Sequence, residues 1–206
     1  FAPAEGSLTS GKVFYGSSAD NSFSYYKITV PGNGYLKITV PEKDESESYH
    51  SYYFRVANSS RKNMLAGDKM LTSSNNYTSY AGVKKGTYYI AVKTYNDNYY
   101  GLQATFSSVK ENSGTSKSKA KSISKGSTKK GVITVSQKAG TGDWYKFVVK
   151  KTQKVTFKVN ARLGGYSGGV KFAVYKRGSS YAFGSISAHE TASGELKPYT
   201  FGKGGK

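Results

Sequence analysis

The sequence predicts an all-β protein made of tandem antiparallel modules. Three observations support this fold class. Apolar and polar residues alternate in short segments along the 206 residues, glycine-rich turns separate these segments, and one block of the pattern occurs twice. No stretch keeps a helical period of 3.6 residues for long. Because side chains alternate faces along a strand, each segment has one apolar face, and many short strands of this kind are typical of a sandwich or a barrel.

The clearest hairpin is formed by two segments of the same pattern. Residues 26–30 (Tyr-Lys-Ile-Thr-Val) put three apolar side chains on one face and lysine and threonine on the other. Residues 31–34 (Pro-Gly-Asn-Gly) supply turn chemistry, because proline fixes φ and glycine and asparagine tolerate positive φ. Residues 36–40 (Leu-Lys-Ile-Thr-Val) repeat the alternation, so the two segments are expected to pair.

Further strands are expected on both sides of this hairpin. They cover residues 12–15, 52–57, 87–94 and 100–106. The last two are rich in β-branched and aromatic residues, and they are entered through Gly86 and Gly101. The first half of the chain therefore contains enough strands for a complete sandwich.

An internal repeat divides the chain into two modules. Tyr26 aligns with Tyr145 at an offset of 119, and Phe54 aligns with Phe172 after a slip of one residue. At the first offset, three apolar residues of one strand also match, and these pairs are Leu36 with Val155, Ile38 with Phe157 and Val40 with Val159. Four successive strands that keep register predict two copies of one module. We expect a first module at 1–109, a linker and leading segment at 110–130, and a second module at 131–206.

The linker and the second module differ from the first. Residues 110–130 are rich in serine and lysine, with Ala120 and Ile123 as apolar anchors. Equivalents of the closing strands, 86–92 and 101–106, would begin near residue 204. We therefore expect the second module to be incomplete at its C-terminus, and to be completed by residues beyond Lys206 in preference to strands from another chain.

Composition excludes several classes of protein. The chain has no cysteine, which removes disulfide scaffolds, thiol nucleophiles and cysteine metal sites. It has two histidines, and it has no apolar run of 18 residues, so no membrane span is expected. The net charge of +19 is concentrated in the second half: residues 1–109 carry 11 basic and 8 acidic side chains, whereas residues 110–206 carry 20 and 4. This distribution allows an anionic polymer as a partner of the second half.

Two motifs carry a resemblance to a known family. Residues 143–147 (Asp-Trp-Tyr-Lys-Phe) begin an alternating strand, and residues 85–92 (Lys-Gly-Thr-Tyr-Tyr-Ile-Ala-Val) precede Tyr100-Gly101-Leu102. This pattern resembles the bacterial pre-peptidase C-terminal domains, which include the collagen-binding modules of clostridial collagenases. The resemblance implies jelly-roll-like sandwiches, secretion or display at a bacterial cell surface, and an accessory role. The first module departs from the pattern in carrying Ser24 where the second has Asp143.

Some members of that family bind calcium through acidic residues that lead into the sandwich. Here the corresponding segment is 110–117, in which Glu111 and Asn112 are the candidate ligands, beside several lysines. Calcium prefers six to eight oxygen ligands with several carboxylates among them. We therefore expect neither a metal nor another cofactor.

Tyrosine is the most unusual component, with 19 residues. Rigid amphipathic rings in loops make good contact surfaces for proteins or sugars. The tyrosines in or beside predicted loops are Tyr49, Tyr52, Tyr53, Tyr95, Tyr99 and Tyr100. These six are the candidate ligand-binding residues. Trp144 lies on the polar face of its predicted strand. We expect the leading segment to cover it through Ile123, in preference to a role for Trp144 as a platform for a ligand.

The sequence offers no catalytic constellation. His189-Glu190, Asp68 and the serines have no spacing that indicates a triad, and no nucleophile elbow surrounds a serine. We therefore expect no enzyme, but a monomeric, secreted or cell-surface bacterial binding module that contacts a glycan or a matrix protein. Two copies would make the contact multivalent. Two alternatives remain open, a structural spacer and a polyanion binder that uses the basic second module.

Overall fold

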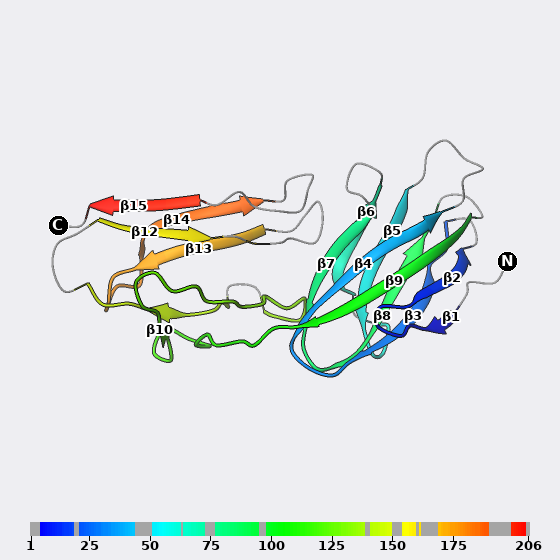
Figure 1. Cartoon of the computed structure of the whole chain (residues 1–206), viewed down its shortest axis with the longest axis horizontal. Coiled ribbons are helices and arrows are strands. Elements are labelled where there is room, and N and C mark those ends of the chain that lie inside the picture. Colours follow the sequence, from blue (N-terminus) through cyan, green and yellow to red (C-terminus); the bar gives the residue numbers. More distant parts are fainter. Residues whose placement is uncertain are drawn as a thin grey trace. The chain divides into compact units, whose positions relative to one another are not determined.

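The structure is a computed structural model whose regular elements are strands (Figure 1). It describes residues 5–18, 21–43, 51–62, 64–72, 77–94, 98–138, 141–149, 154–159, 161, 169–189 and 199–204. The strands are β1 (Glu5–Ser7), β2 (Val13–Ser18), β3 (Ser24–Val30), β4 (Gly34–Lys43), β5 (Tyr52–Asn58), β6 (Met64–Leu71), β7 (Thr78–Val83), β8 (Gly86–Lys93), β9 (Asn98–Ser108), β10 (Lys121–Ser122), β11 (Tyr145–Lys146), β12 (Lys154–Val159), β13 (Gly169–Tyr175), β14 (Ala182–His189) and β15 (Tyr199–Gly204). Within the described residues there is no helix of the length and apolarity needed to cross a membrane.

Strands β2 to β9 form a jelly roll. Their pairing is nested: β2 pairs with β9, β3 with β8, β4 with β7 and β5 with β6, always antiparallel. The nested pairs are distributed over two sheets, with the strand orders β1-β3-β8-β5-β6 and β2-β9-β4-β7. This is the double Greek-key arrangement of a jelly roll. The prediction of an all-β sandwich is confirmed.

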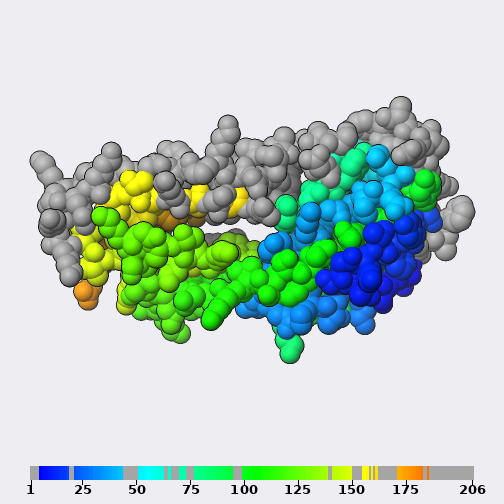
Figure 2. All heavy atoms as spheres, in the orientation of Figure 1, coloured from blue at the N-terminus to red at the C-terminus, as the bar shows by residue number. Residues whose placement is uncertain are grey.

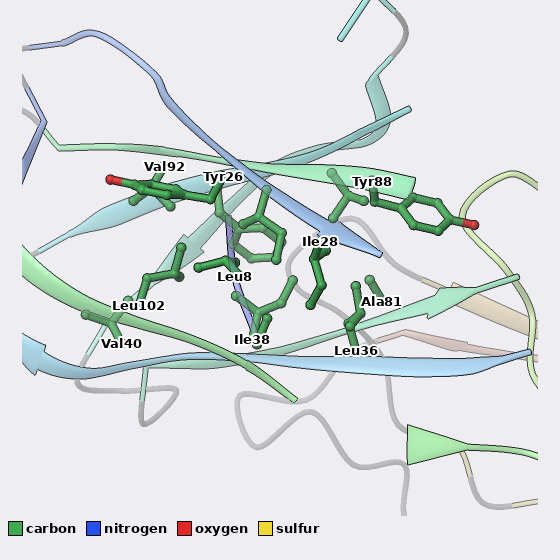
Figure 3. Packing of buried hydrophobic residues seen from close by; sticks show 14 of the residues in the cluster. Leu8, Tyr26, Ile28, Leu36, Ile38, Val40, Ala81, Tyr88, Val92 and Leu102 are labelled. Carbon is green, nitrogen blue, oxygen red and sulfur yellow. The ribbon is translucent and has the colours of Figure 1, made fainter. Parts of the chain in front are cut away.

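The core lies between these two sheets. The alternation read from the sequence places Tyr26, Ile28 and Val30 of β3 on the buried face, and Leu36 and Ile38 of β4 face them from the other sheet. Figure 3 shows Tyr26 and Ile28 near Leu36 and Ile38 in the middle of the sandwich. β3 and β4 each bury one face only, so their lysine and threonine side chains at the alternate positions remain on the two outer faces.

A segment after the jelly roll covers one open edge of it. Residues 132–135 lie along β7, where the Val135 amide donates a hydrogen bond of 2.8 Å to the Gly82 carbonyl oxygen. Val135 packs against the core, and Thr134 is buried. A side chain at Gly82 would overlap the Ile133 carbonyl group. This close approach protects an edge that could otherwise pair with a foreign strand.

Contacts divide the chain into residues 1–148 and 149–206. Residues 131–148, which the sequence assigned to the second module, thus group with the first unit, because the segment along β7 belongs to them. Within this part, β10 pairs parallel with β11 as β1 does with β3. The Leu8 amide donates to the Lys27 carbonyl oxygen at 2.7 Å, and the Ile123 amide donates to the Lys146 carbonyl oxygen at 2.9 Å. Lys27 and Lys146 are aligned by the repeat. The division into tandem modules stays a prediction.

The described residues of the second unit form two antiparallel strand pairs. β12 pairs with β15, and β13 pairs with β14. The rings of Phe157 and Phe172, one from each pair, lie with their centroids 5.6 Å apart. In the repeat alignment β12 corresponds to β4 and β13 to β5. The pairs β12–β15 and β13–β14 are nested in the chain as β4–β7 and β5–β6 are in the jelly roll.

Candidate binding surface

The structure separates the tyrosines that were predicted to bind a ligand. Tyr49 and Tyr95 lie outside the described residues. Tyr52 and Tyr100 lie on β5 and β9, and their exposed fractions are 1% and 0%. The expectation that these two rings beside the loops are accessible is therefore wrong, because a ring without exposed surface has nothing to present to a ligand.

The two buried tyrosines belong to an aromatic cluster in the core. The hydroxyl oxygens of Tyr100 and Tyr26 are 2.7 Å apart and share a hydrogen bond. The ring centroid of Tyr100 lies 6.2 Å from that of Tyr26 and 5.9 Å from that of Tyr52, both edge to face. Burial, followed by the neighbouring Tyr26, raises the pKa of Tyr100. The Tyr26 and Tyr100 hydroxyls therefore stay neutral, and their hydrogen bond joins the two sheets.

Among the described residues of the jelly roll, Tyr15 and Tyr99 are the two most exposed tyrosines. Tyr15 of β2 is 62% exposed, and Tyr99 of β9 is 51% exposed. Tyr15 lies opposite Gly101 and Ser17 opposite Tyr99, so the two rings are diagonal neighbours on the outer face. Diagonal positions are about 7–8 Å apart, within reach of aromatic side chains. In Figure 2 these strands, in blue and green, lie side by side at the surface.

Glu42 completes this surface, which we call the Tyr15–Tyr99 surface. β9 lies between β2 and β4, and Gly101 is opposite both Tyr15 and Glu42. Because Gly101 has no side chain, the Tyr15 hydroxyl reaches across β9 and donates a hydrogen bond of 2.8 Å to Glu42 Oε1. A Cβ atom at this position would lie 3.1 Å from Glu42 Cβ. The hydrogen bond to Glu42 raises the pKa of Tyr15 and fixes the orientation of its ring.

The outer face of the other sheet carries Tyr53, which is half-buried on β5. Lys93 lies opposite, with its Nζ 5.5 Å from the Tyr53 ring centroid. On the same face the guanidinium of Arg61 lies 4.3 Å from the Tyr89 ring and forms an ion pair with Glu5. These rings are partnered by cations of the same chain. The Tyr53 and Tyr89 rings therefore already contact cations of the same chain, so this face is a weaker candidate for ligand binding than the Tyr15–Tyr99 surface.

Two carboxylates approach each other in the segment after the jelly roll. Glu111 Oε2 accepts a hydrogen bond of 3.0 Å from the Val132 amide, whereas its buried Oε1 has no hydrogen-bond partner. A Cβ atom on Gly131 would lie 2.7 Å from Asp143 Oδ2 and 3.2 Å from Glu111 Oε1. Burial, and then the charge of Glu111, raise the pKa of Asp143. The sequence predicts Glu111 as a candidate ligand but gives no sign that Asp143, 32 residues further along the chain, lies next to it.

The described residues contain no group of three acidic, histidine or cysteine side chains close enough to hold a metal ion. Asn112, the other candidate ligand beside Glu111, is exposed. His50 and Glu190 lie outside the described residues, and His189 is described at its backbone alone, at the end of β14. The expected absence of catalysis, metal and cofactor stays a prediction.

Trp144 is half-buried beside the leading segment. Its amide donates to the Gly114 carbonyl oxygen and its carbonyl oxygen accepts from the Gly114 amide, both at 2.9 Å. The Lys121 amide donates to the same Trp144 carbonyl oxygen at 3.1 Å. The leading segment therefore lies against this strand through its backbone.

The chain is similar to the pre-peptidase C-terminal domain of collagenase from Bacillus anthracis, with 16% sequence identity and a TM-score of 0.39. The match covers 51% of this chain and 98% of that domain. No family model matches the sequence, and no curated protein matches it.

Proposed function

We propose that the jelly roll is a non-catalytic binding module that contacts a glycan or a protein outside the bacterial cell through the Tyr15–Tyr99 surface. One observation carries this proposal: two exposed rings lie on neighbouring strands, and Glu42 fixes one of them. Rigid tyrosine rings supply contact area with little loss of side-chain entropy. The sequence motifs at 85–92 and 143–147 support an accessory, secreted role through the family that they resemble.

The chemistry of the surface defines the kind of ligand. The ring faces suit the apolar faces of sugar rings or apolar side chains of a protein. The Glu42 carboxylate, which accepts from the Tyr15 hydroxyl, has further lone pairs for hydroxyl or amide donors. Gln103 and Thr39 lie next to it on the same sheet, with 3.4 Å between their side-chain oxygens. A neutral, hydroxyl-rich ligand fits this surface better than an anionic one.

The test is binding of the full chain to glycan arrays and to immobilised matrix proteins. The variant is Tyr15→Ala/Tyr99→Ala, and the control is Tyr181→Ala, a more exposed tyrosine on another part of the chain. Loss of two central aromatic contacts corresponds to about 2 kcal/mol or more, a decrease in affinity of roughly 30-fold. We expect this decrease in the double variant and unchanged binding in the control. A folded double variant that binds as well as the wild type would refute the assignment.

An exposed lysine cluster supports a second candidate function, binding of an anionic polymer. The lysines of this cluster are Lys117, Lys119, Lys121, Lys125, Lys129 and Lys130, and all are exposed. Such binding falls steeply with salt concentration, because bound counterions are released. Binding that survives the double tyrosine change but is lost between 50 and about 200 mM salt would identify this function. Absence of any ligand under both conditions would favour the structural spacer.

A further inference from the structure

The exposed lysine cluster is carried by a segment whose backbone is fixed, although the sequence predicts a linker there. Gly114 and Trp144 exchange two backbone hydrogen bonds of 2.9 Å, and the Lys121 amide donates to the same Trp144 carbonyl oxygen at 3.1 Å. Two residues further on, the Ile123 amide donates to the Lys146 carbonyl oxygen at 2.9 Å. Because this backbone is held in place before a ligand arrives, binding requires little additional ordering of the chain.

A tight loop brings three lysines of the cluster together. The Lys119 amide donates to the Ser116 carbonyl oxygen at 3.1 Å, which closes a turn. A side chain at Gly114 would overlap the Lys119 carbonyl group, so the two ends of the loop are in contact. The side chains that leave this loop and the first position of β10 are exposed, and they belong to Lys117, Lys119 and Lys121.

Acidic residues leave most of this charge uncompensated. Residues 110–149 contain nine lysines, all of them exposed, and two acidic residues, Glu111 and Asp143. The two carboxylates are half-buried and approach each other at Gly131, where a Cβ atom would lie 3.2 Å from Glu111 Oε1 and 2.7 Å from Asp143 Oδ2. The charge of the surface therefore complements an anionic partner.

The composition of the cluster argues against recognition of nucleic-acid bases. Residues 110–130 contain no arginine and no aromatic residue. Arginine reads guanine through paired hydrogen bonds, and exposed aromatic rings stack on the bases of single strands. The aromatic residues next to the segment, Trp144 and Tyr145, are half-buried. The cluster can therefore attract a charged backbone but has little to offer a base.

The use of lysine alone also favours phosphate over sulfate esters. The lysine ammonium group is a compact, strongly hydrated point charge, whereas the guanidinium group of arginine is more weakly hydrated. Ions of similar hydration pair best, and a phosphate ester is more strongly hydrated than a sulfate ester. Hydroxyl groups are common donors to phosphate oxygens, and Ser116, Ser118 and Ser122 lie next to the lysines in the sequence.

We propose that the exposed lysine cluster binds a linear phosphodiester polymer without bases, of the polyol phosphate type. The proposal rests on the second candidate function, binding of an anionic polymer, and it names the class of polymer. It is independent of the Tyr15–Tyr99 surface. Each lysine that neutralises a phosphate releases a counterion, so affinity increases with the number of lysines engaged and falls with salt.

The experiment measures binding of the full chain to three polymers with the same number of charges. The probe is a synthetic poly(glycerol phosphate), and the comparison polymers are oligothymidylate and a sulfated glycan. One variant is Lys117→Gln/Lys119→Gln/Lys121→Gln. The matched control is Lys27→Gln/Lys84→Gln/Lys85→Gln, which removes three exposed lysines, and therefore the same charge, from the jelly roll.

We expect poly(glycerol phosphate) to bind most tightly of the three polymers. Each lysine near an anionic surface contributes about a factor of 5 in affinity, so the cluster variant should bind this polymer roughly 100-fold more weakly at low salt. The slope of log affinity against log salt should decrease by about 2 in the cluster variant. The control should lose far less affinity and keep the slope of the wild type.

The outcomes separate the class of polymer from the polyanion function as such. Equal or tighter binding of oligothymidylate or of the sulfated glycan would overturn the phosphodiester assignment and leave the polyanion function in place. Equal losses in the cluster variant and the control would show that the lysine cluster is not the site. Absence of binding by all three polymers at low salt would overturn the polyanion function and this proposal together.

Discussion

Tyr99 and Tyr100 are adjacent in sequence, yet alanine substitutions at the two positions should have opposite consequences. Tyr100 is 0% exposed and lies in the aromatic cluster of the core, whereas Tyr99 is half-exposed on the outer face. A buried tyrosine removes about 150–250 Å² from water, which at about 25 cal/mol per Å² corresponds to roughly 4–6 kcal/mol. Truncation of buried aromatic residues costs about 3–5 kcal/mol in practice. We expect a loss of this size for Tyr100→Ala and less than about 1 kcal/mol for Tyr99→Ala.

The assay is urea unfolding of the full chain, followed by near-ultraviolet circular dichroism, which reports packed tyrosines. Because small domains are stable by only about 5–15 kcal/mol, Tyr100→Ala should shift the unfolding midpoint strongly or unfold the first unit. Tyr99→Ala should leave the midpoint almost unchanged. Equal shifts for the two variants, or a larger shift for Tyr99→Ala, would refute the assignment of β9 side chains to the inner and outer faces.

Two further predictions concern a close backbone contact and the carboxylate pair. Gly34→Ala should destabilise the jelly roll by about 1–3 kcal/mol in the same urea titration, because the added methyl group would overlap the Ser107 carbonyl group of β9. Gly32→Ala, in the turn before it, is the control, because a methyl group there meets open space. The pKa of Asp143 is raised in the folded state. Protonated Asp143 therefore contributes to the stability of the fold below the ordinary carboxyl pKa, and this contribution is lost as pH rises through the folded-state pKa. Asp143→Asn should therefore raise the melting temperature increasingly from pH 3.5 towards pH 7, and an identical shift at all pH values would contradict the electrostatic origin.

The strands that the sequence predicts most accurately are those with strict alternation. β3 and β4 bury every second residue over long stretches, and both were predicted within a few residues. β6 and β7 were not predicted: β6 reads Met-Leu-Ala-Gly-Asp-Lys-Met-Leu, and β7 contains glycine among small residues. Their strand conformation comes from pairing with β5 and β4 rather than from their own composition.

The candidate surface could be predicted only in part, because it depends on register between strands. Tyr15 follows Val13 and Phe14 and shows no loop signal, so only its position opposite Gly101 reveals it. Glu42 joins it through a bulge that interrupts the pairing of β4 with β9 between Thr39 and Glu42. Residues this far apart in sequence carry no local pattern that would bring them together.

Adjacent tyrosine pairs explain why four of the six candidate tyrosines could not be told apart from the sequence. Four such pairs occur on strands, and each contributes one buried ring and one ring to an outer face; the pairs are Tyr25-Tyr26, Tyr52-Tyr53, Tyr88-Tyr89 and Tyr99-Tyr100. Since successive side chains on a strand point to opposite faces, a doublet always serves both the core and the surface. Changing both members of a doublet would therefore confuse loss of binding with loss of the fold. Tyr15 belongs to no doublet, and Tyr99 is the outward member of its doublet. Both rings are exposed on different strands, so their double variant tests binding without removing a core ring.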